Sequence, residues 1–505
     1  MKPESGKTES IWMGTFDVPI FNSLKNDTNA DVCIIGAGIT GLTCAYMLMK
    51  SGKSVIVVDD GNIGGGESSR TTAHITNVID DRYYIIERLH GENVSRLAAE
   101  SQTAAINLIE KIITENKIEC DFTRLNGYLI FKPEERAGVL EREYDACQRA
   151  GLNVNIAPQP PISSLGDYPC LEFPGQAEFH MLKYLSAIAE IITSNGGRIF
   201  TNIHINKITD GSPASAETKN KIKITAKDII VATNSPVSDY VAIHTKQASY
   251  RTYVIGVRIP KDSVPHALYW DNEDPYHYIR IYKQHKNDIL IVGGEDHKTG
   301  QEDEPEKRFQ ELIKWTSERF PMAEHIEYKW SGQVIEPFDG LSFIGKDPEN
   351  SEHVYIATGD SGMGITHASF AAILLDDMIN GRQNDWADIY DPKRITLKAA
   401  PEFVREGFNT AIQYIDIITP PEYSDESEIP YGTGAVLSFG KDKYAVYKDH
   451  NGKIYKFSAL CPHLKCVVEW NKTEKTWDCP CHGSRFEATG KVINGPALTD
   501  LKPIK

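Results

Sequence analysis

The sequence predicts an α/β domain built around a parallel sheet, an antiparallel-sheet subdomain that belongs to it, and a small all-β domain that follows. Three observations predict this arrangement. Residues 32–58 read as a buried strand, a glycine-rich turn, a helix and a second buried strand, which together form a βαβ unit. Alternating and β-branched runs over 122–131 and 251–293 favour antiparallel strands. Beyond residue 428 the chain reads as short strands and turns.

Composition narrows the class of protein. The 505 residues are 41% hydrophobic and 25% charged, which is typical of a globular protein and excludes a disordered or fibrous chain. The net charge of -16 repels phosphate backbones, so we expect no nucleic-acid partner. No apolar run approaches the length of a transmembrane helix, and the polar start lacks the apolar core of a secretory signal. We therefore expect a cytoplasmic protein, with peripheral membrane attachment left open.

Changes in composition divide the chain into four parts. Residues 1–28 are polar and irregular and read as an arm. Residues 29–395 form the α/β domain, with its second subdomain built from discontinuous segments. Residues 396–428 read as a helix and an acidic linker rich in proline and serine. Residues 429–505 are too few for a large core without a metal or a disulfide.

The turn after the first predicted strand carries a complete GxGxxG pattern, Gly36-Ala37-Gly38-Ile39-Thr40-Gly41. The first glycine permits a tight turn, the second lets the backbone approach a pyrophosphate, and the third lets the helix pack against the strand. Asp59 closes the second strand, where an acidic side chain accepts hydrogen bonds from a ribose. The pattern predicts dinucleotide binding. A glycine-rich connection in another α/β sheet is the alternative.

Three later segments distinguish between dinucleotides. Residues 64–74 are rich in glycine and hydroxyl groups, residues 228–234 are a buried strand ending in an Ala-Thr turn, and residues 357–367 are a second glycine-rich strand-to-helix turn. In order and character they resemble the D-amino-acid oxidase superfamily, which includes glycine oxidase, sarcosine oxidase and amino-acid dehydrogenases. The resemblance covers roughly residues 28–395. It implies an FAD-binding, Rossmann-like domain of the glutathione-reductase type.

The resemblance also implies which residues hold an extended FAD. The groups expected to contact it, in chain order from the ADP half to the flavin ring, are Gly36, Ala37, Gly38, Thr40, Gly41, Asp59, Arg70, Thr71, Thr72, Ala232, Gly362, Met363 and Gly364. The last three would present backbone N–H groups at a helix N-terminus, which stabilises negative charge on a reduced flavin. A simple helix cap is the other interpretation of that loop. His74 is a minor candidate for a covalent flavin link.

Cysteine and histidine cluster in two loops of the last segment. One loop offers Cys461 and His463, and the other offers Cys479 and His482. Two thiolates on one iron and two imidazoles on the other form the ligand set of a Rieske 2Fe–2S centre. A structural zinc site uses the same residue types. Against zinc stand two further cysteines, one in each loop, which zinc would leave without a role.

Those two cysteines, Cys466 and Cys481, resemble the disulfide that ties the loops together in Rieske proteins of cytochrome bc-type complexes. Ser484 resembles the serine whose hydroxyl bonds a cluster sulfur and raises the potential. Phe486 stands where high-potential relatives have a tyrosine. We therefore expect a potential within the range of about -150 to +300 mV but below that of the tyrosine-bearing proteins.

Together the two halves resemble a bacterial group of fused FAD/Rieske oxidoreductases. The resemblance suggests that a small amine or amino acid gives hydride to FAD, and that electrons then pass singly through the cluster to an external acceptor, a protein or a quinone. We expect the electrons to leave at an exposed histidine edge formed by His463 and His482.

A run of aromatic and basic residues suggests where the substrate binds. Arg280 would clamp a carboxylate, and Tyr278, with Tyr276 beside it, would wall an apolar pocket. Plain strand packing is the alternative. His367 faces the flavin or caps its helix, with a slight preference for capping.

Three other functions remain open. The chain could be an electron-transfer component that runs in the opposite direction, from the cluster to FAD. It could be a redox sensor that holds both cofactors without turnover. A Rieske oxygenase is disfavoured, because no facial triad of two histidines and a carboxylate is evident.

Overall fold

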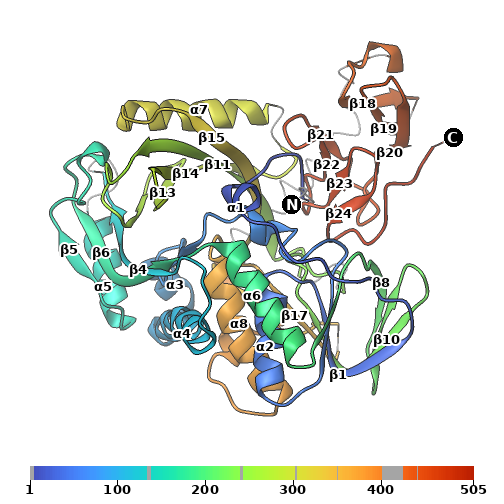
Figure 1. Ribbon diagram of the computed structural model, residues 1–505, viewed down its shortest axis with the longest axis horizontal. Coiled ribbons are helices and arrows are strands. Elements are labelled where there is room, and N and C mark those ends of the chain that lie inside the picture. Colours follow the sequence, from blue (N-terminus) through green and yellow to red (C-terminus); the bar gives the residue numbers. More distant parts are fainter. Residues whose placement is uncertain are drawn as a thin grey trace.

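The computed structural model describes residues 5–132, 138–238, 243–301, 304–349, 351–400, 423, 425–440 and 442–504. Figure 1 shows an α/β body with two sheets and a small β domain, drawn in red, attached to one side of it. Most of the segment expected to form a helix and linker lies outside the described residues. Among the helices that the structure describes, none combines the length and apolar character needed to cross a bilayer.

The first sheet of the body has eight strands in the described part of the chain and carries the βαβ unit. Its order is β16 (Phe343–Lys346), β17 (Val354–Thr358), β10 (Lys223–Val231), β1 (Thr28–Ile35), β2 (Val55–Val58) and β7 (Arg198–Phe200), with β8 (Ile205–Thr209) and β9 (Ala214–Thr218) added through β10. Strands β17, β10, β1, β2 and β7 run parallel, so their carboxyl ends meet at one edge. The predicted parallel sheet is confirmed.

Three helices cover this sheet and lie side by side in Figure 1: α2 (Ile39–Lys50), α6 (Met181–Ser194) and α8 (Gly364–Ile379). Both α2 and α8 are apolar on most sides, because they pack between the sheet and further helices. The helical stretch expected over residues 82–118 is two helices, α3 (Tyr83–His90) and α4 (Glu92–Asn116). They are separated at Gly91, whose φ of +94° ends the first helix. The remaining helices are α5 (Val139–Arg149), α7 (Pro305–Arg319) and α9 (Ala387–Tyr390), with 3₁₀ turns η1 (Glu67–Arg70), η2 (Ser163–Leu165), η3 (Leu397–Ala399) and η5 (Glu426–Glu428).

The second sheet forms the expected subdomain. Its order is β15 (Ile326–Pro337), β11 (Gln247–Pro260), β14 (Asn287–Lys298), β13 (His277–Tyr282), β12 (Leu268–Asp271), β4 (Thr123–Ile130), β6 (Cys170–Glu178) and β3 (His74–Ile75), with β5 (Asn155–Ala157) beside β6. Its pairs are antiparallel except β12 with β4, which run parallel. The long strands β11, β14 and β15 each bury half or more of their residues, and α7 packs against β11 and β14.

The small domain has two antiparallel sheets among its described residues. One contains β18 (Thr433–Phe439), β19 (Asp442–Lys448) and β20 (Ile454–Ser458). The other contains β21 (Glu469–Asn471), β22 (Thr476–Asp478), β23 (Arg485–Glu487) and β24 (Val492–Asn494). Their core includes Trp477 and Phe486, both fully buried. The all-β fold expected for this domain is confirmed.

The N-terminal arm joins the two domains. Its short helix α1 (Ile11–Thr15) buries Ile11 and Trp12 completely, and the Trp12 indole donates to the Thr71 carbonyl. Before that helix, Ser5 accepts a hydrogen bond from Arg485, and Thr8 donates to Glu474. Figure 1 places this start of the chain between the α/β body and the small domain.

Candidate functional site

The GxGxxG turn lies at the carboxyl edge of the parallel sheet. Gly36 has φ +108°, and a Cβ there would lie 2.4 Å from the Ala232 carbonyl oxygen. A Cβ on Gly41 would lie 1.9 Å from the Gly36 carbonyl oxygen. Glycine is therefore required at both positions, by the tight turn and by the close packing of α2 on β1.

Polar groups surround the N-terminus of α2. The Ile39 N–H donates to the Ser68 hydroxyl at 3.0 Å, and the Asp59 carboxylate accepts from the Ala37 N–H at 2.6 Å and from the Gly61 N–H at 2.8 Å. A helix N-terminus attracts an anion, and Asp59 stands at the end of β2, where a ribose is expected. Ser68 was not singled out from the sequence, although it lies in the hydroxyl-rich segment.

A cavity of about 550 Å³ runs from this turn into the second subdomain. Its walls include the residues expected to hold FAD from all four segments, among them Gly36, Gly38, Thr40, Asp59, Thr71, Thr72, Ala232, Gly362, Met363 and Gly364. Ala37 lies behind this wall, where its N–H donates to the lining residue Asp59. An elongated cavity that begins at a glycine turn and ends beyond a second helix N-terminus fits an extended FAD.

The far end of the cavity meets the N-terminus of α8. Gly362 has φ +74°, and a Cβ there would lie 2.1 Å from Asp80 Oδ2. A Cβ on Gly364 would lie 2.9 Å from Asp360 Oδ2. Small residues thus leave backbone N–H groups open to the cavity, which suits a flavin ring that becomes negatively charged on reduction.

Arg70 lines the cavity, as expected for this segment, but the contacts of its guanidinium lie toward the small domain. Its guanidinium donates to the Ser331 carbonyl at 2.7 Å and pairs with Glu474 of the small domain at 3.3 Å. Arg251 also approaches Glu474, at 3.7 Å. These cations hold the pKa of Glu474 at about 2, although burial alone would raise it. Arg70 therefore ties the domains together, a role that its neighbours in the sequence do not indicate.

The two cysteine- and histidine-bearing loops of the small domain bring the four expected metal ligands together. The two imidazole rings lie with their centroids 5.1 Å apart, and Nδ1 of each ring is buried. Nδ1 of His482 has no hydrogen-bond partner among the described residues. Cys461 and Cys479 are buried and are not in a disulfide. Two buried imidazole nitrogens together with two buried thiols fit a 2Fe–2S cluster.

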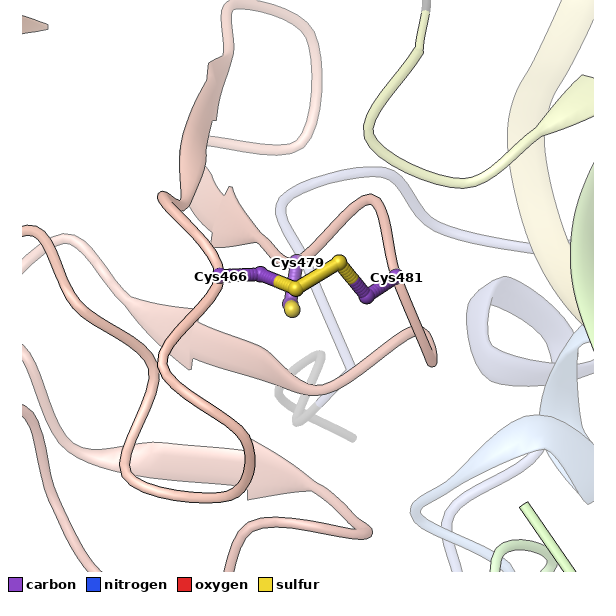
Figure 2. A group of neighbouring side chains, drawn as sticks. All are labelled: Cys466, Cys479 and Cys481. Carbon is purple, nitrogen blue, oxygen red and sulfur yellow. A yellow bond between two sulfur atoms is a disulfide. The ribbon is translucent and has the colours of Figure 1, made fainter. Parts of the chain in front are cut away.

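Cys466 and Cys481 form a disulfide between the two loops, with Cα atoms 6.4 Å apart. Figure 2 shows the Cys479 sulfur next to this bridge. The Ala497 N–H of the third covering loop donates to the Ser484 hydroxyl at 3.0 Å. Each of the four loop cysteines thus has a place in one centre, which a zinc site would not provide.

The histidine edge of the centre lies next to the α/β body. The His463 ring packs edge-on against His244, with centroids 5.3 Å apart, and His244 is only 3% exposed. The Ser249 hydroxyl donates to the His482 carbonyl at 3.3 Å. Both His463 and His482 remain partly exposed, so an electron exit at this edge stays a prediction.

The residues expected at the substrate end have different roles. Tyr278 lines the cavity, bonds Thr252 through its hydroxyl and stacks on Tyr276 at 5.5 Å. Arg280 does not line it. Its Nη1 donates to the carbonyls of Thr72, Ala73 and Phe179 and its Nε pairs with Glu178, so these contacts hold the guanidinium behind the cavity wall.

Two histidines line the cavity near the flavin end. His367 bonds the Ser342 hydroxyl through Nδ1 at 2.8 Å, so its ring does not cap α8. Both ring nitrogens of His74 have partners, the Thr72 hydroxyl and the Ile279 carbonyl, which disfavours a covalent link. Burial lowers the pKa of each histidine to about 3, so both are neutral at pH 7.

The sequence did not indicate a group of carboxylates at this same end. Asp80 and Asp360 line the cavity, and Asp296 and Glu336 lie close enough to raise the pKa values of their acidic neighbours. Burial is the largest cause and brings the pKa of Asp80 to about 7, of Asp296 to about 7 and of Asp360 to about 6. The four belong to segments too far apart in sequence to form a recognisable motif.

Fold and sites together define a two-cofactor oxidoreductase: a dinucleotide-binding enzyme domain with an iron–sulfur domain docked on it. The family model described as FAD dependent oxidoreductase matches residues 31–378, and the model described as Rieske [2Fe-2S] domain matches residues 421–505. The chain belongs to the FAD dependent oxidoreductase family and carries a Rieske domain. Its first domain binds FAD, and its second binds a 2Fe–2S cluster.

Individual relatives agree with this assignment. The Rieske 2Fe-2S iron-sulfur protein YhfW of Bacillus subtilis (strain 168) is 32% identical over 98% of this chain and 97% of its own length. Gamma-glutamylputrescine oxidoreductase of Escherichia coli (strain K12) is 25% identical over 72% of this chain and 86% of its own. Glycine oxidase from Geobacillus kaustophilus has a TM-score of 0.60 at 18% identity, covering 73% of this chain and 99% of that one. The last comparison supports the fold alone.

Proposed function

We propose that this protein is a dehydrogenase that oxidises a small amine or amino acid at its C–N bond and sends the electrons through its own Rieske domain to an external one-electron acceptor. The enzyme class follows from the family. We also propose the direction of electron flow, the internal route and the roles of the residues named below.

One contact carries the internal route. Gln333 lines the FAD cavity, and its Nε2 donates to the Gly483 carbonyl at 3.1 Å. Gly483 follows His482 directly in the chain, so a single hydrogen bond joins the cavity wall to the residue next to an expected iron ligand. Gln301 adds a second bond, to the Pro480 carbonyl at 3.3 Å. Both contacts support transfer between the two centres without movement of the domain.

Close packing supports the same route. Gly483 has φ +75°, and a Cβ there would lie 2.3 Å from the Ser249 hydroxyl oxygen. A Cβ on Gly300 would lie 2.8 Å from the Pro480 nitrogen. The cluster loop and the body therefore touch at backbone distance, which shortens the gap that electrons cross.

Bound FAD supplies a two-electron acceptor, and the cluster supplies a one-electron carrier. The chain's residues then have four expected tasks. Gly36, Gly38, Gly41 and Asp59 hold the ADP half, and Gly362 and Gly364 direct N–H groups at the ring. Met363 lines the cavity beside them, but its N–H donates to the Asp360 carbonyl. Tyr276 and Tyr278 wall the substrate space and exclude water. Cys461, His463, Cys479 and His482 hold the cluster.

The experiment is an anaerobic one. Purified holoprotein is mixed with amines and amino acids, and visible spectra and low-temperature electron paramagnetic resonance (EPR) spectra are recorded. We expect bleaching of the flavin followed by the signal of a reduced Rieske cluster. If no compound bleaches the flavin while a chemical reductant reduces both centres, the electron-transfer component or the redox sensor replaces the dehydrogenase.

A further inference from the structure

The flavin end of the cavity is strongly acidic. Asp80 follows β3, Asp296 lies on β14, Glu336 lies on β15, and Asp360 lies in the loop before α8. Asp80 and Asp360 sit against Gly362 and Gly364, where the flavin ring is expected. Asp80 and Asp360 thus bring two carboxyl groups to the place where substrate would meet the flavin, and Asp296 and Glu336 lie close to them without lining the cavity.

Basic side chains of the described residues do not neutralise this group. Of the basic residues on the cavity wall, Arg70 is paired with Glu474, and Lys491 is exposed at the surface. Arg82 lowers the pKa of Asp80, but its guanidinium donates to the main-chain carbonyls of Asp80 and Asp271, and the effect of burial on the pKa of Asp80 is larger. The charge on the carboxylates therefore stays largely uncompensated.

At least one of these groups has an open hydrogen-bonding position. Asp296 Oδ1 is buried and has no partner among the described residues, and Asp80, which is exposed and lines the cavity, makes no side-chain hydrogen bond with them. Burying a carboxylate without a cation or a donor costs several kcal/mol. A ligand that brings positive charge and N–H donors removes that cost.

The spacing of the carboxylates distinguishes an organic cation from a metal ion. Among the described residues, Asp271, Glu273 and His277 have oxygen or nitrogen atoms within 4.8 Å of one another, and none of the four cavity carboxylates belongs to such a group. Spread carboxylates match an extended cation better than a single ion. The stacked rings of Tyr276 and Tyr278 add aromatic faces, which attract ammonium groups.

Among the described residues, the arginine and lysine on the cavity wall are Arg70, which pairs with Glu474, and Lys491, which is exposed, so neither is placed to hold a carboxylate beside the flavin. Arg280, the expected clamp, is bonded to main-chain carbonyls and to Glu178. The neighbouring Asp80 and Asp360 would repel a carboxylate at the same place. An α-amino acid therefore fits this end poorly.

We infer that the substrate is an extended diamine or polyamine without a carboxylate group. One nitrogen lies beside the flavin, and a second ammonium group is held by the cavity carboxylates. This inference rests on the proposed dehydrogenase function and names its substrate class. The carboxylates set specificity; the hydride acceptor remains the flavin.

In the proposed reaction the nearer ammonium loses a proton, the C–H bond next to that nitrogen breaks, and its electron pair leaves as hydride to the flavin. The nitrogen lone pair forms the C=N bond of an iminium ion, which water hydrolyses to an aldehyde and an ammonium ion. The two electrons leave through the cluster, one at a time, to a one-electron acceptor protein or a quinone.

The first test uses the wild-type holoprotein. Unbranched α,ω-diamines of three to six carbons are compared with monoamines of the same length and with α-amino acids in anaerobic flavin reduction. We expect diamines to reduce the flavin with an apparent Kd at least about tenfold lower than matched monoamines, which corresponds to one added charged contact. Equal affinities, or tighter binding of amino acids, overturn the inference while leaving the dehydrogenase function intact.

The second test measures binding apart from turnover. Diamines are titrated calorimetrically into chemically reduced holoprotein, which accepts no further hydride. Asp80→Asn and Glu336→Gln are compared with Asp274→Asn, which alters an exposed carboxylate on the same subdomain. We expect the first two to weaken diamine binding about tenfold or more and to leave monoamine binding unchanged, and the control to bind normally.

The two tests separate two kinds of failure. Tight, selective diamine binding without flavin reduction contradicts the dehydrogenase function but supports the cation site. Equal loss of diamine and monoamine binding in both variants contradicts the site. The wild-type comparison stands by itself if a variant fails to fold.

Discussion

The ring of His244, on the α/β body, packs edge-on against the ring of His463, on the Rieske domain, with centroids 5.3 Å apart. His463 is an expected iron ligand, and His244 is buried. The contact turns the histidine edge of the cluster toward the FAD domain. Both ligand histidines keep part of their surface exposed beside this contact.

The fit of the cluster loop against the body can be tested at Gly483. In Gly483→Ala the new Cβ would lie 2.3 Å from the Ser249 hydroxyl oxygen, at a φ of +75° that side chains rarely adopt. We expect the loop to move away from the body and flavin-to-cluster transfer to slow by about tenfold or more. Gly440→Ala is the matched control, because its φ is +65° but its Cβ meets nothing within 4 Å. Stopped-flow absorbance measures both; equal rates would contradict the route.

The ion pairs that Glu474 forms with Arg70 and Arg251 connect the two domains and can be tested by substitution. Glu474→Gln leaves Arg70 and Arg251 buried without their counter-charge, so we expect a loss of about 3–5 kcal/mol in the free energy of unfolding at pH 7. Denaturant unfolding measures it. Because the pKa of Glu474 is lowered from 4.5 to about 2, the stabilisation is present above pH 4.5 and is lost as the pH falls toward 2. The difference in the free energy of unfolding between wild type and variant should shrink over that pH range. A constant difference would contradict a stabilising role of these ion pairs.

The dinucleotide turn makes a prediction for FAD content. Gly41→Ala brings a methyl group within 1.9 Å of the Gly36 carbonyl, so the turn has to open. We expect purified protein with little FAD and a normal Rieske EPR signal. Gly52→Ala, at the end of the same helix, has φ +83° and open space around its Cβ. It should cost about 1 kcal/mol of stability and keep its flavin; loss of FAD in both variants equally would weaken the assignment of the turn.

The cluster ligands make the complementary prediction. Cys479→Ala removes an expected iron ligand, so the Rieske EPR signal and the iron content should vanish while flavin absorbance remains. Cys170→Ala changes a buried cysteine of β6 and should leave both cofactors in place. Iron analysis and EPR spectra of the two proteins test whether the cluster is lost in the first variant and kept in the second. Retention of bound iron in Cys479→Ala would point to a different ligand set.

The cavity carboxylates predict how substrate binding depends on pH. Because burial raises the pKa of Asp80 to about 7 and of Asp360 to about 6, both gain negative charge between pH 5 and pH 8. Diamine binding to the reduced protein should therefore tighten as the pH rises through this range, with protons released. Calorimetry in buffers of different ionisation enthalpy measures the release. Binding that weakens with rising pH would contradict the cation site.

Features that depend on local spacing could be predicted from the sequence. Gly36, Gly41 and the Cys-x-His and Cys-x-x-His loops place their groups through turns of a few residues, so spacing alone is informative. The βαβ unit and the all-β domain followed from hydrophobic periodicity for the same reason.

Features that depend on contacts between residues far apart in the chain could not be predicted from the sequence. Arg70 and Glu474 are 404 residues apart in the chain, and Arg280 and Thr72 are 208 apart. An arginine next to a nucleotide segment or on a tyrosine-rich strand reads as a ligand-binding group until its actual partners are known. The acidic end of the cavity is likewise assembled from four separate elements, none of which is unusual alone.

The central claim is that electrons pass from flavin to cluster within one molecule. Holoprotein is mixed with a reducing substrate in an anaerobic stopped-flow instrument, at several protein concentrations, and cluster reduction is followed after flavin bleaching. The account predicts a first-order rate that does not change with protein concentration. A rate that rises in proportion to protein concentration would mean that the cluster is reduced by a second molecule, and would contradict it.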